Sequence, residues 1–290
     1  ADYIFYPRRK QELNIRQFHK GDLQLVSNTN IYSIIEDGYT NEPEEIYYQN
    51  GKFFLFSKMF SERDKTQLLA LEVFNDRCER EKYQILDTLK NDEIQYIEEA
   101  EDKSGFILAK HLKYTQLVEQ EISLLRIDNV GEINWTHNVK SPMALQSLRI
   151  ENMCLQEDGP IYILCNYAFD LGSGTGNNDQ LVNNKYSLWA YDHDQGFLKE
   201  FEIRIKSKWI NGLDISFNQS NDLVMSGYFN ETKNPAINGV FSMLIKDDLS
   251  VKHTSWTKFD ENTIYKFLKQ ENKRKHEELD DYKFKDLAIM

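Results

Sequence analysis

The sequence predicts an all-β protein with a β-propeller-like fold, built from repeated four-stranded antiparallel blades. Between Asn221 and Ile245, two apolar strand-like runs are joined by a polar connection that contains Asn234-Pro235. Looser copies of this pair recur upstream at intervals of about 50 to 60 residues, which suits a propeller blade of ~40–50 residues with loop insertions. A β-sandwich is the alternative, but a sandwich would not need repeated copies of one pattern.

The composition supports a packed core and excludes several classes of protein. Of the 290 residues, 40% are hydrophobic and 13% are aromatic, so we reject disorder for the bulk of the chain. The net charge is -12, and an acidic surface repels phosphate backbones, so we expect no nucleic-acid partner. No apolar run approaches the ~20 residues of a membrane-spanning helix, so we expect no transmembrane segment.

Residues 1–44 predict N-terminal strands that precede the repeats. Short strands are expected at Tyr3–Tyr6, Asp22–Ser27 and Ile31–Ile35, because apolar and polar residues alternate in the last two. Gly38–Pro43 has the composition of a polar turn. Closure of a propeller ring often uses the N-terminal strand, so residues 1–44 are a candidate ring latch.

Residues 45–259 contain four blade-like repeats, each with the order strand, turn, strand, loop, strand, turn, strand. Asn50-Gly51 between two apolar runs is the strongest short signal for a β-hairpin. The second strands of the four repeats are expected to begin near Phe53, Phe106, Ile161 and Leu223. Four blades are clear, and the two ends of the chain leave material for a fifth.

The character of the chain changes after Phe259. Residues 260–281 predict one highly charged helix with apolar positions at Ile264, Phe267 and Leu268. Residues 282–290 alternate again, as a closing strand would. We therefore expect residues 1–290 to form a single propeller-like domain.

Asp192 and Asp194 together form a candidate calcium site. Carboxylates at alternate positions before Gly196 are typical of calcium loops, because oxygen ligands must converge on one ion. The downstream Glu of such a loop is not at the expected place, and Asp and Gly are also favoured in hairpin turns. We otherwise assign no catalytic, cofactor-binding or metal-ligating residue and no cofactor. The three cysteines are expected to be free.

Three motifs stand out in the C-terminal part of the chain: Asp222-Leu-Val-Met-Ser-Gly-Tyr-Phe, Ala236-Ile-Asn-Gly-Val-Phe and Glu277-Glu-Leu-Asp-Asp-Tyr-Lys-Phe-Lys-Asp-Leu. With them the chain resembles an uncharacterised family of exported proteins of Bacteroidetes, over roughly residues 45 to 290, specifically in the last 80 residues and loosely before them. The resemblance implies a propeller-like protein of the cell envelope, located in the periplasm or at the cell surface in association with the outer membrane. Similar proteins continue past Asp286-Leu287 with a Gly-rich hairpin, so a closing strand is expected to be missing here or supplied by the N-terminal segment.

Our leading functional hypothesis is a non-enzymatic envelope propeller that binds or scaffolds a protein partner, as part of an outer-membrane or surface complex. The alternative is a glycan-active hydrolase or lyase, or a glycan-binding module, that uses a propeller face. Exposed aromatic side chains lining a groove would favour glycan binding. The four tryptophans fall in strands or at strand ends, where packing between blades is their expected role.

Overall fold

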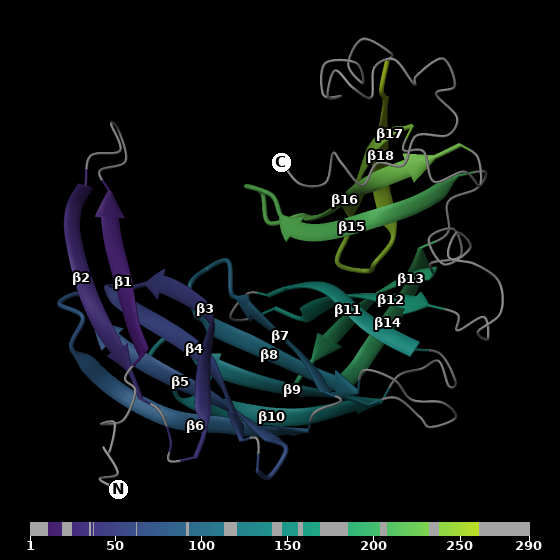
Figure 1. Cartoon of the computed structure of the whole chain (residues 1–290). Coiled ribbons are helices and arrows are strands. Elements are labelled where there is room, and N and C mark those ends of the chain that lie inside the picture. The colour runs from purple at the N-terminus through teal and green to yellow at the C-terminus, as the bar shows by residue number, and fades with distance from the viewer. Residues whose placement is uncertain are drawn as a thin grey trace, which may run out of the picture. The chain divides into compact units, whose positions relative to one another are not determined.

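The computed structural model describes residues 11–18, 25–34, 36, 38–61, 63–90, 93–112, 121–140, 147–155, 159–168, 185–203, 208–231 and 238–260. Within these ranges every regular element is a β-strand (Figure 1). The all-β prediction is confirmed.

Four four-stranded antiparallel sheets repeat along the described chain, and in each of them consecutive strands are neighbours. The first sheet is β3 (Thr40–Gln49), β4 (Lys52–Ser61), β5 (Thr66–Asn75) and β6 (Arg80–Lys90). The second is β7 (Glu93–Glu99), β8 (Gly105–Leu112), β9 (Glu121–Asp128) and β10 (Ile133–Lys140). The third is β11 (Ser147–Cys154), β12 (Ile161–Ala168), β13 (Lys185–Asp192) and β14 (Gly196–Ile203). The fourth is β15 (Trp209–Phe217), β16 (Leu223–Asn230), β17 (Gly239–Ile245) and β18 (Val251–Lys258).

The repeat that the sequence predicts is therefore the repeat of a four-stranded blade. The second strands begin at Lys52, Gly105, Ile161 and Leu223, each within one residue of the expected start. Asn50 and Gly51 have φ values of 50° and 78°, the positive values that a two-residue hairpin needs. The sheets are propeller-like blades, and the sandwich alternative is not needed.

The N-terminal strands differ from the prediction. β1 (Gln11–Phe18) pairs antiparallel with β2 (Leu25–Ser33) in a separate two-stranded sheet. The strands expected at Asp22–Ser27 and Ile31–Ile35 are thus replaced by one continuous strand, because pairing with β1 satisfies the backbone of the polar residues between them. The strand expected at Tyr3–Tyr6 lies outside the described residues.

The turn expected at Gly38–Pro43 is also wrong in part, because β3 begins at Thr40. Pro43 lies within this strand, which is at the edge of its sheet. A proline is tolerated there because an edge strand leaves some N–H positions without a partner strand. The register of β3 against β4 shifts between Pro43 and Glu45, which marks a bulge next to the proline.

The chain divides into two compact units, and the core of each is apolar. The first unit contains β1 to β6 and most of the β7–β10 sheet, and the second contains β11 to β18. In the first unit, buried residues of β4 and β5 pack against Phe106 and Leu108 of β8. The Phe106 ring lies 4.9 Å from that of Phe54 and 5.2 Å from that of Phe56. The prediction of a single domain over residues 1–290 stays a prediction.

The core of the second unit lies between its two sheets. Buried side chains of β12 and β13, such as Leu164 and Leu188, pack with Met225 of β16 and Met243 of β17. Trp256 of β18 is half-buried and lies with its ring 5.0 Å from Phe229. One face of the β15–β18 sheet is therefore covered by apolar packing.

A buried carboxylate ties the β1–β2 sheet to the first four-stranded sheet. Glu72 of β5 has no exposed surface, and its carboxylate accepts hydrogen bonds from the Ile34 backbone N–H at 3.1 and 3.2 Å. The Ser33 hydroxyl donates to the same carboxylate. The Arg80 Nε lies 2.7 Å from Glu72 Oε2 and supplies the compensating positive charge. Ile31 of β2 packs beside this cluster on Leu55 and Phe74.

The three cysteines are free. Cys154 and Cys165 lie on adjacent strands, but Cys154 is opposite Tyr162 and Cys165 is opposite Ile150, so the register does not pair them. Complete burial raises the pKa of the Cys165 thiol well above its usual value, which leaves it protonated and unreactive at neutral pH.

Several predicted features lie outside the described residues. They are the helix at 260–281 apart from Asp260 and the closing strand at 282–290, which is the C-terminal part of the suggested fifth blade. Its N-terminal part, β1 and β2, forms a separate two-stranded sheet. Among the described residues, no helix has the length and apolar character needed to span a membrane.

Candidate functional site

The outer face of the β15–β18 sheet carries a row of polar side chains. Successive residues of a strand point to opposite faces of the sheet, so the neighbours of buried Met225 and Met243 point away from the core. Ser226 and Ser242 occupy these positions, on β16 and β17. The face that does not pack in the core therefore presents these two hydroxyl groups, next to Val224 and Leu244 of the same strands.

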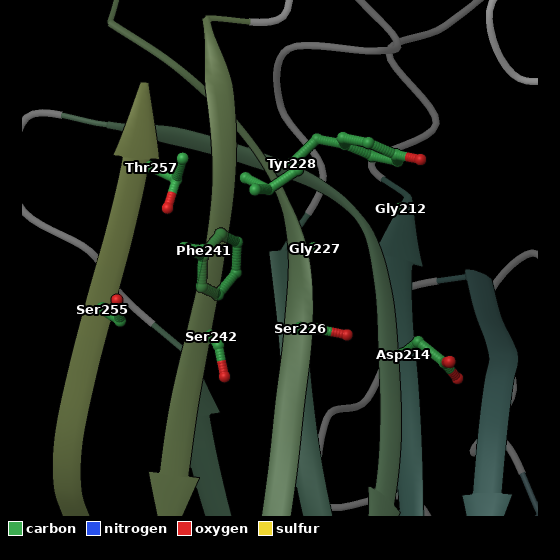
Figure 2. A pocket seen from close by; sticks show the side chains of 10 residues that line it. Gly212, Asp214, Ser226, Gly227, Tyr228, Phe241, Ser242, Ser255 and Thr257 are labelled. Atoms are coloured by element: carbon green, nitrogen blue, oxygen red, sulfur yellow. The ribbon is translucent and has the colours of Figure 1, made fainter. Parts of the chain in front are cut away.

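The register aligns one polar residue from each strand into a single row. Asp214 of β15 is opposite Ser226, Ser226 is opposite Ser242, and Ser242 is opposite Ser255 of β18. Figure 2 shows these side chains on neighbouring strands of the sheet. Neighbouring strands lie ~4.8 Å apart, so the row crosses roughly 14 Å from β15 to β18.

A bulge in β15 decides that Asp214 belongs to this row. Asn211 is opposite Tyr228 and Asp214 is opposite Ser226, so β15 has one residue more than β16 in this interval. Without the extra residue, Leu213 would face Ser226 and Asp214 would point into the core. Gly212 sits in the bulge with a φ of 56°, a conformation that residues with a side chain rarely adopt.

Gly212 also allows Tyr228 to close one end of the site. A Cβ at position 212 would lie 2.9 Å from Cδ2 of the Tyr228 ring, so only glycine permits this close approach. Tyr228 is 38% exposed, which is high for so large a ring. Tyr228 is opposite Val240 of β17, and Val240 is opposite Thr257 of β18. These three residues form a second row across the strands, next to the polar row.

Together these residues line a pocket of about 440 Å³. Its walls include the four residues of the polar row, together with Tyr228 and Thr257 (Figure 2). This volume is in the range of pockets that hold small organic ligands. Among the described residues, no group hydrogen-bonds to the hydroxyls of Ser226, Ser242 or Ser255, so they are available to a ligand.

One of the two oxygens of the Asp214 carboxylate is fixed by hydrogen bonds from neighbouring groups. Oδ1 accepts hydrogen bonds from Asn152 Nδ2 on β11 and from the Ile215 backbone N–H, the latter at 3.0 Å. No donor among the described residues reaches Oδ2. Asp214 therefore presents an oriented acceptor at the end of the polar row.

The predicted calcium candidates lie elsewhere, in the turn between β13 and β14. Asp192 Oδ1 accepts the backbone N–H groups of Asp194 at 2.8 Å and Gln195 at 3.3 Å, which is the geometry of an Asx turn. Oxygens of Asp192 and Asp194 and a ring nitrogen of His193 lie within 4.8 Å of one another. The turn accounts for the Asp192 carboxylate, while Asp194 Oδ1 lies 3.2 Å from His193 Nε2. Calcium binding there stays a prediction.

Two histidines of the second unit lie in partly or fully buried surroundings. His111 is buried. His137 Nδ1 lies 2.7 Å from the Tyr191 hydroxyl, and burial together with the nearby Asp192 charge raises the pKa of Tyr191. Both belong to the second unit and neither lines the pocket.

The strand pair that first indicated the repeat contains part of this candidate pocket, although the sequence analysis assigned no site to it. Residues 221–245 contain β16 and β17, and therefore contain Ser226, Tyr228 and Ser242. One serine in the middle of each of these two otherwise apolar strands is the signal that could have identified a polar face. The partnership with Asp214 depends on the bulge and has no comparable signal.

Comparison with known proteins gives distant structural similarities. No protein-family model and no curated protein matches the chain. The cobalt-substituted apocarotenoid oxygenase of Synechocystis has 9% identity and a TM-score of 0.48, over 84% of this chain and 55% of that one. A GH93 α-L-arabinofuranosidase of Fusarium graminearum, in complex with arabinobiose, has 9% identity and a TM-score of 0.45, over 78% of this chain and 68% of that one. The chain spans about half the length of the oxygenase, and likenesses this distant assign no function to it.

Proposed function

We propose that the outer face of the β15–β18 sheet binds a neutral carbohydrate. The observation that carries the proposal is the row of Asp214, Ser226, Ser242 and Ser255 along one pocket, with the Tyr228 ring at its end. Serine hydroxyls both donate and accept hydrogen bonds, and a carboxylate accepts from ligand hydroxyls. An aromatic ring supplies an apolar surface for the C–H face of a sugar.

The charges favour a neutral ligand over an anionic one. The pocket contains the acidic side chain of Asp214, and no cation is among the described residues that line it. The net charge of the chain is -12, so the field of the whole protein repels anions as well. Uronic acids, sulfated sugars and nucleotides are expected to bind poorly.

The pocket is suited to binding rather than to cleavage. Most glycoside hydrolases use two carboxyl groups, one on each side of the scissile bond. Asp214 is the single carboxylate among the described residues that line this pocket. We therefore propose a binding module in place of the hydrolase or lyase alternative.

Asp214→Asn is expected to weaken binding of neutral sugars by about 10-fold to 100-fold, because a charge-assisted hydrogen bond contributes ~1.5–3 kcal/mol. The asparagine keeps an oxygen for Asn152 and removes the acceptor that faces the ligand. Isothermal titration calorimetry against hexoses, pentoses and their oligosaccharides provides the measurement.

Asp222→Asn is the matched control, because Asp222 precedes β16 and lies outside the pocket, with Lys252 Nζ 3.9 Å from its carboxylate. It makes the same change of charge on the same sheet and is expected to leave affinity unchanged. Equal affinities of the two variants, or no binding of any neutral sugar, would contradict the proposal.

A protein partner is a second candidate function, and one surface of the first unit favours it. Ile46 and Tyr48 of β3 are 47% and 58% exposed beside buried Leu55 of β4, which leaves an apolar strip. The double variant I46S/Y48S is expected to abolish crosslinks to a partner in the native host. V251S, which changes an exposed apolar residue of β18, is expected to retain them. Retained crosslinks in the double variant would count against this surface.

Export to the cell envelope stays a proposal that the sequence resemblance supports. The likeness covers Asp222-Leu-Val-Met-Ser-Gly-Tyr-Phe, the strand that carries Ser226 and Tyr228 of the pocket. A carbohydrate-binding face would meet extracellular or periplasmic glycans in that compartment. Fractionation of the host with an antibody to this chain tests it, and recovery in the cytoplasm alone would contradict it.

A further inference from the structure

We propose that the pocket on the β15–β18 sheet takes an extended, linear neutral oligosaccharide that lies across the strands. This inference rests on the proposed carbohydrate binding and goes beyond it in naming the length and direction of the ligand. Three features of the polar row support it: the length of the row, the repetition of one group along it and the difference between its two ends.

The length of the row exceeds what a single sugar ring can contact. Asp214 on β15 and Ser255 on β18 are separated by two intervening strands, a span of roughly 14 Å. A monosaccharide placed against Asp214 and Tyr228 leaves Ser255 without a ligand contact. A ligand that uses every member of the row must therefore contain several sugar units in an extended chain.

The row repeats one chemical group at a constant step. Ser226, Ser242 and Ser255 present the same hydroxyl on three consecutive strands, at the spacing of the sheet. None of the three is engaged by another described residue. Repeated identical groups on the protein match a ligand whose own hydroxyl groups repeat along its length, as they do in a linear homopolymer.

The two ends of the row have different chemistry. The β15–β16 end has the Asp214 carboxylate and the Tyr228 ring, which together hold a sugar by a charge-assisted hydrogen bond and a stacking surface. The β17–β18 end has the hydroxyls of Ser242, Ser255 and Thr257. One sugar unit is thus fixed at the β15–β16 end, and the following units extend toward β18 along the hydroxyls.

The experiment is a titration of linear neutral oligosaccharides of increasing length, from the monosaccharide to the hexasaccharide, against the full chain. Glucan, mannan, xylan and arabinan series serve as probes. Affinity is expected to rise by about 10-fold or more between the monosaccharide and the tetrasaccharide, because each added hydrogen bond contributes ~0.5–1.5 kcal/mol. It should then level off once the row is filled.

Variants at the two ends separate the parts of the inference. Ser255→Ala with Thr257→Val is expected to remove most of the gain in affinity between the monosaccharide and the tetrasaccharide, because the longer ligands depend most on this end of the row. Asp214→Asn is expected to weaken all lengths. Ser216→Ala changes a serine of the same face outside the pocket. This control variant is expected to change neither the affinity for the monosaccharide nor the gain in affinity with ligand length. Thermal unfolding of each variant verifies that the fold is retained.

The outcomes distinguish failure of the inference from failure of the proposed function. Equal affinity for all lengths would overturn the cross-strand arrangement and leave carbohydrate binding in place. The same conclusion would follow if Ser255→Ala with Thr257→Val weakened the binding of the monosaccharide and of the hexasaccharide by the same factor. Absence of binding for every sugar would overturn both.

Discussion

Arg80→Met is expected to lower the free energy of unfolding of the first unit by about 3 kcal/mol, the lower end of the ~3–5 kcal/mol range for a broken buried ion pair, because the Arg80 side chain is itself 31% exposed. Glu72 has no exposed surface, and Arg80 Nε, 2.7 Å away, compensates its charge. The variant leaves a buried carboxylate with two neutral donors, Ile34 N–H and the Ser33 hydroxyl. Arg80 also lies 5.4 Å from the centre of the Phe74 ring, and methionine keeps part of that apolar contact.

Urea unfolding provides the free energy, and hydrogen exchange locates the effect. Exchange at the Ile34 amide and along β2 should accelerate, because these groups depend on the same carboxylate. Arg77→Met is the control, since Arg77 is an exposed residue of the same β5–β6 turn. If both variants lost the same stability, the loss would come from net charge, and the buried pair would have no special role.

Gly105→Ala is the second substitution with a large expected effect, a loss of about 3 kcal/mol or more. A Cβ at this position would lie 2.1 Å from the Ile127 carbonyl oxygen and 2.7 Å from backbone atoms of Asp128. These are backbone atoms of the neighbouring strand β9, which cannot move aside without breaking the sheet. The φ of 136° adds strain of ~1–3 kcal/mol, and overpacking adds a similar amount.

Gly196→Ala separates the two contributions. Gly196 has a positive φ of 77°, but no atom lies within 4 Å of the Cβ that alanine would bring. Its expected loss is about 1–2 kcal/mol from backbone strain alone. Thermal and urea unfolding of both variants measure the difference, and a Gly105→Ala protein as stable as Gly196→Ala would show that β8 and β9 lie farther apart than described.

The blades could be predicted from the sequence because their signals are local. The hairpin at Asn50-Gly51 needs two positive φ values, and these residues are the ones that adopt them at low cost. β1 was missed because apolar and polar residues alternate only over Glu12–Arg16, and Ile15 is its one described contact with a core cluster. Its pairing with β2 is a tertiary property.

The candidate site could be predicted in part. The polar positions Ser226 and Ser242 are visible in the sequence of one strand pair, but their alignment with Asp214 follows from a single inserted residue in β15. A shift of one residue moves a side chain to the other face of a sheet, so register decides which residues meet. Periodicity does not contain this information when a bulge intervenes.

The meander order of the four-stranded sheets has a consequence for how the chain acquires its structure. Every four-stranded sheet forms from consecutive strands, so its hydrogen bonds close short loops and carry a small entropic penalty. Contacts of this kind favour rapid folding for a β protein. During synthesis from the N-terminus, each sheet can complete itself once its fourth strand has emerged, before the next sheet exists. The β15–β18 sheet, with its polar row, is then the last of the four to form.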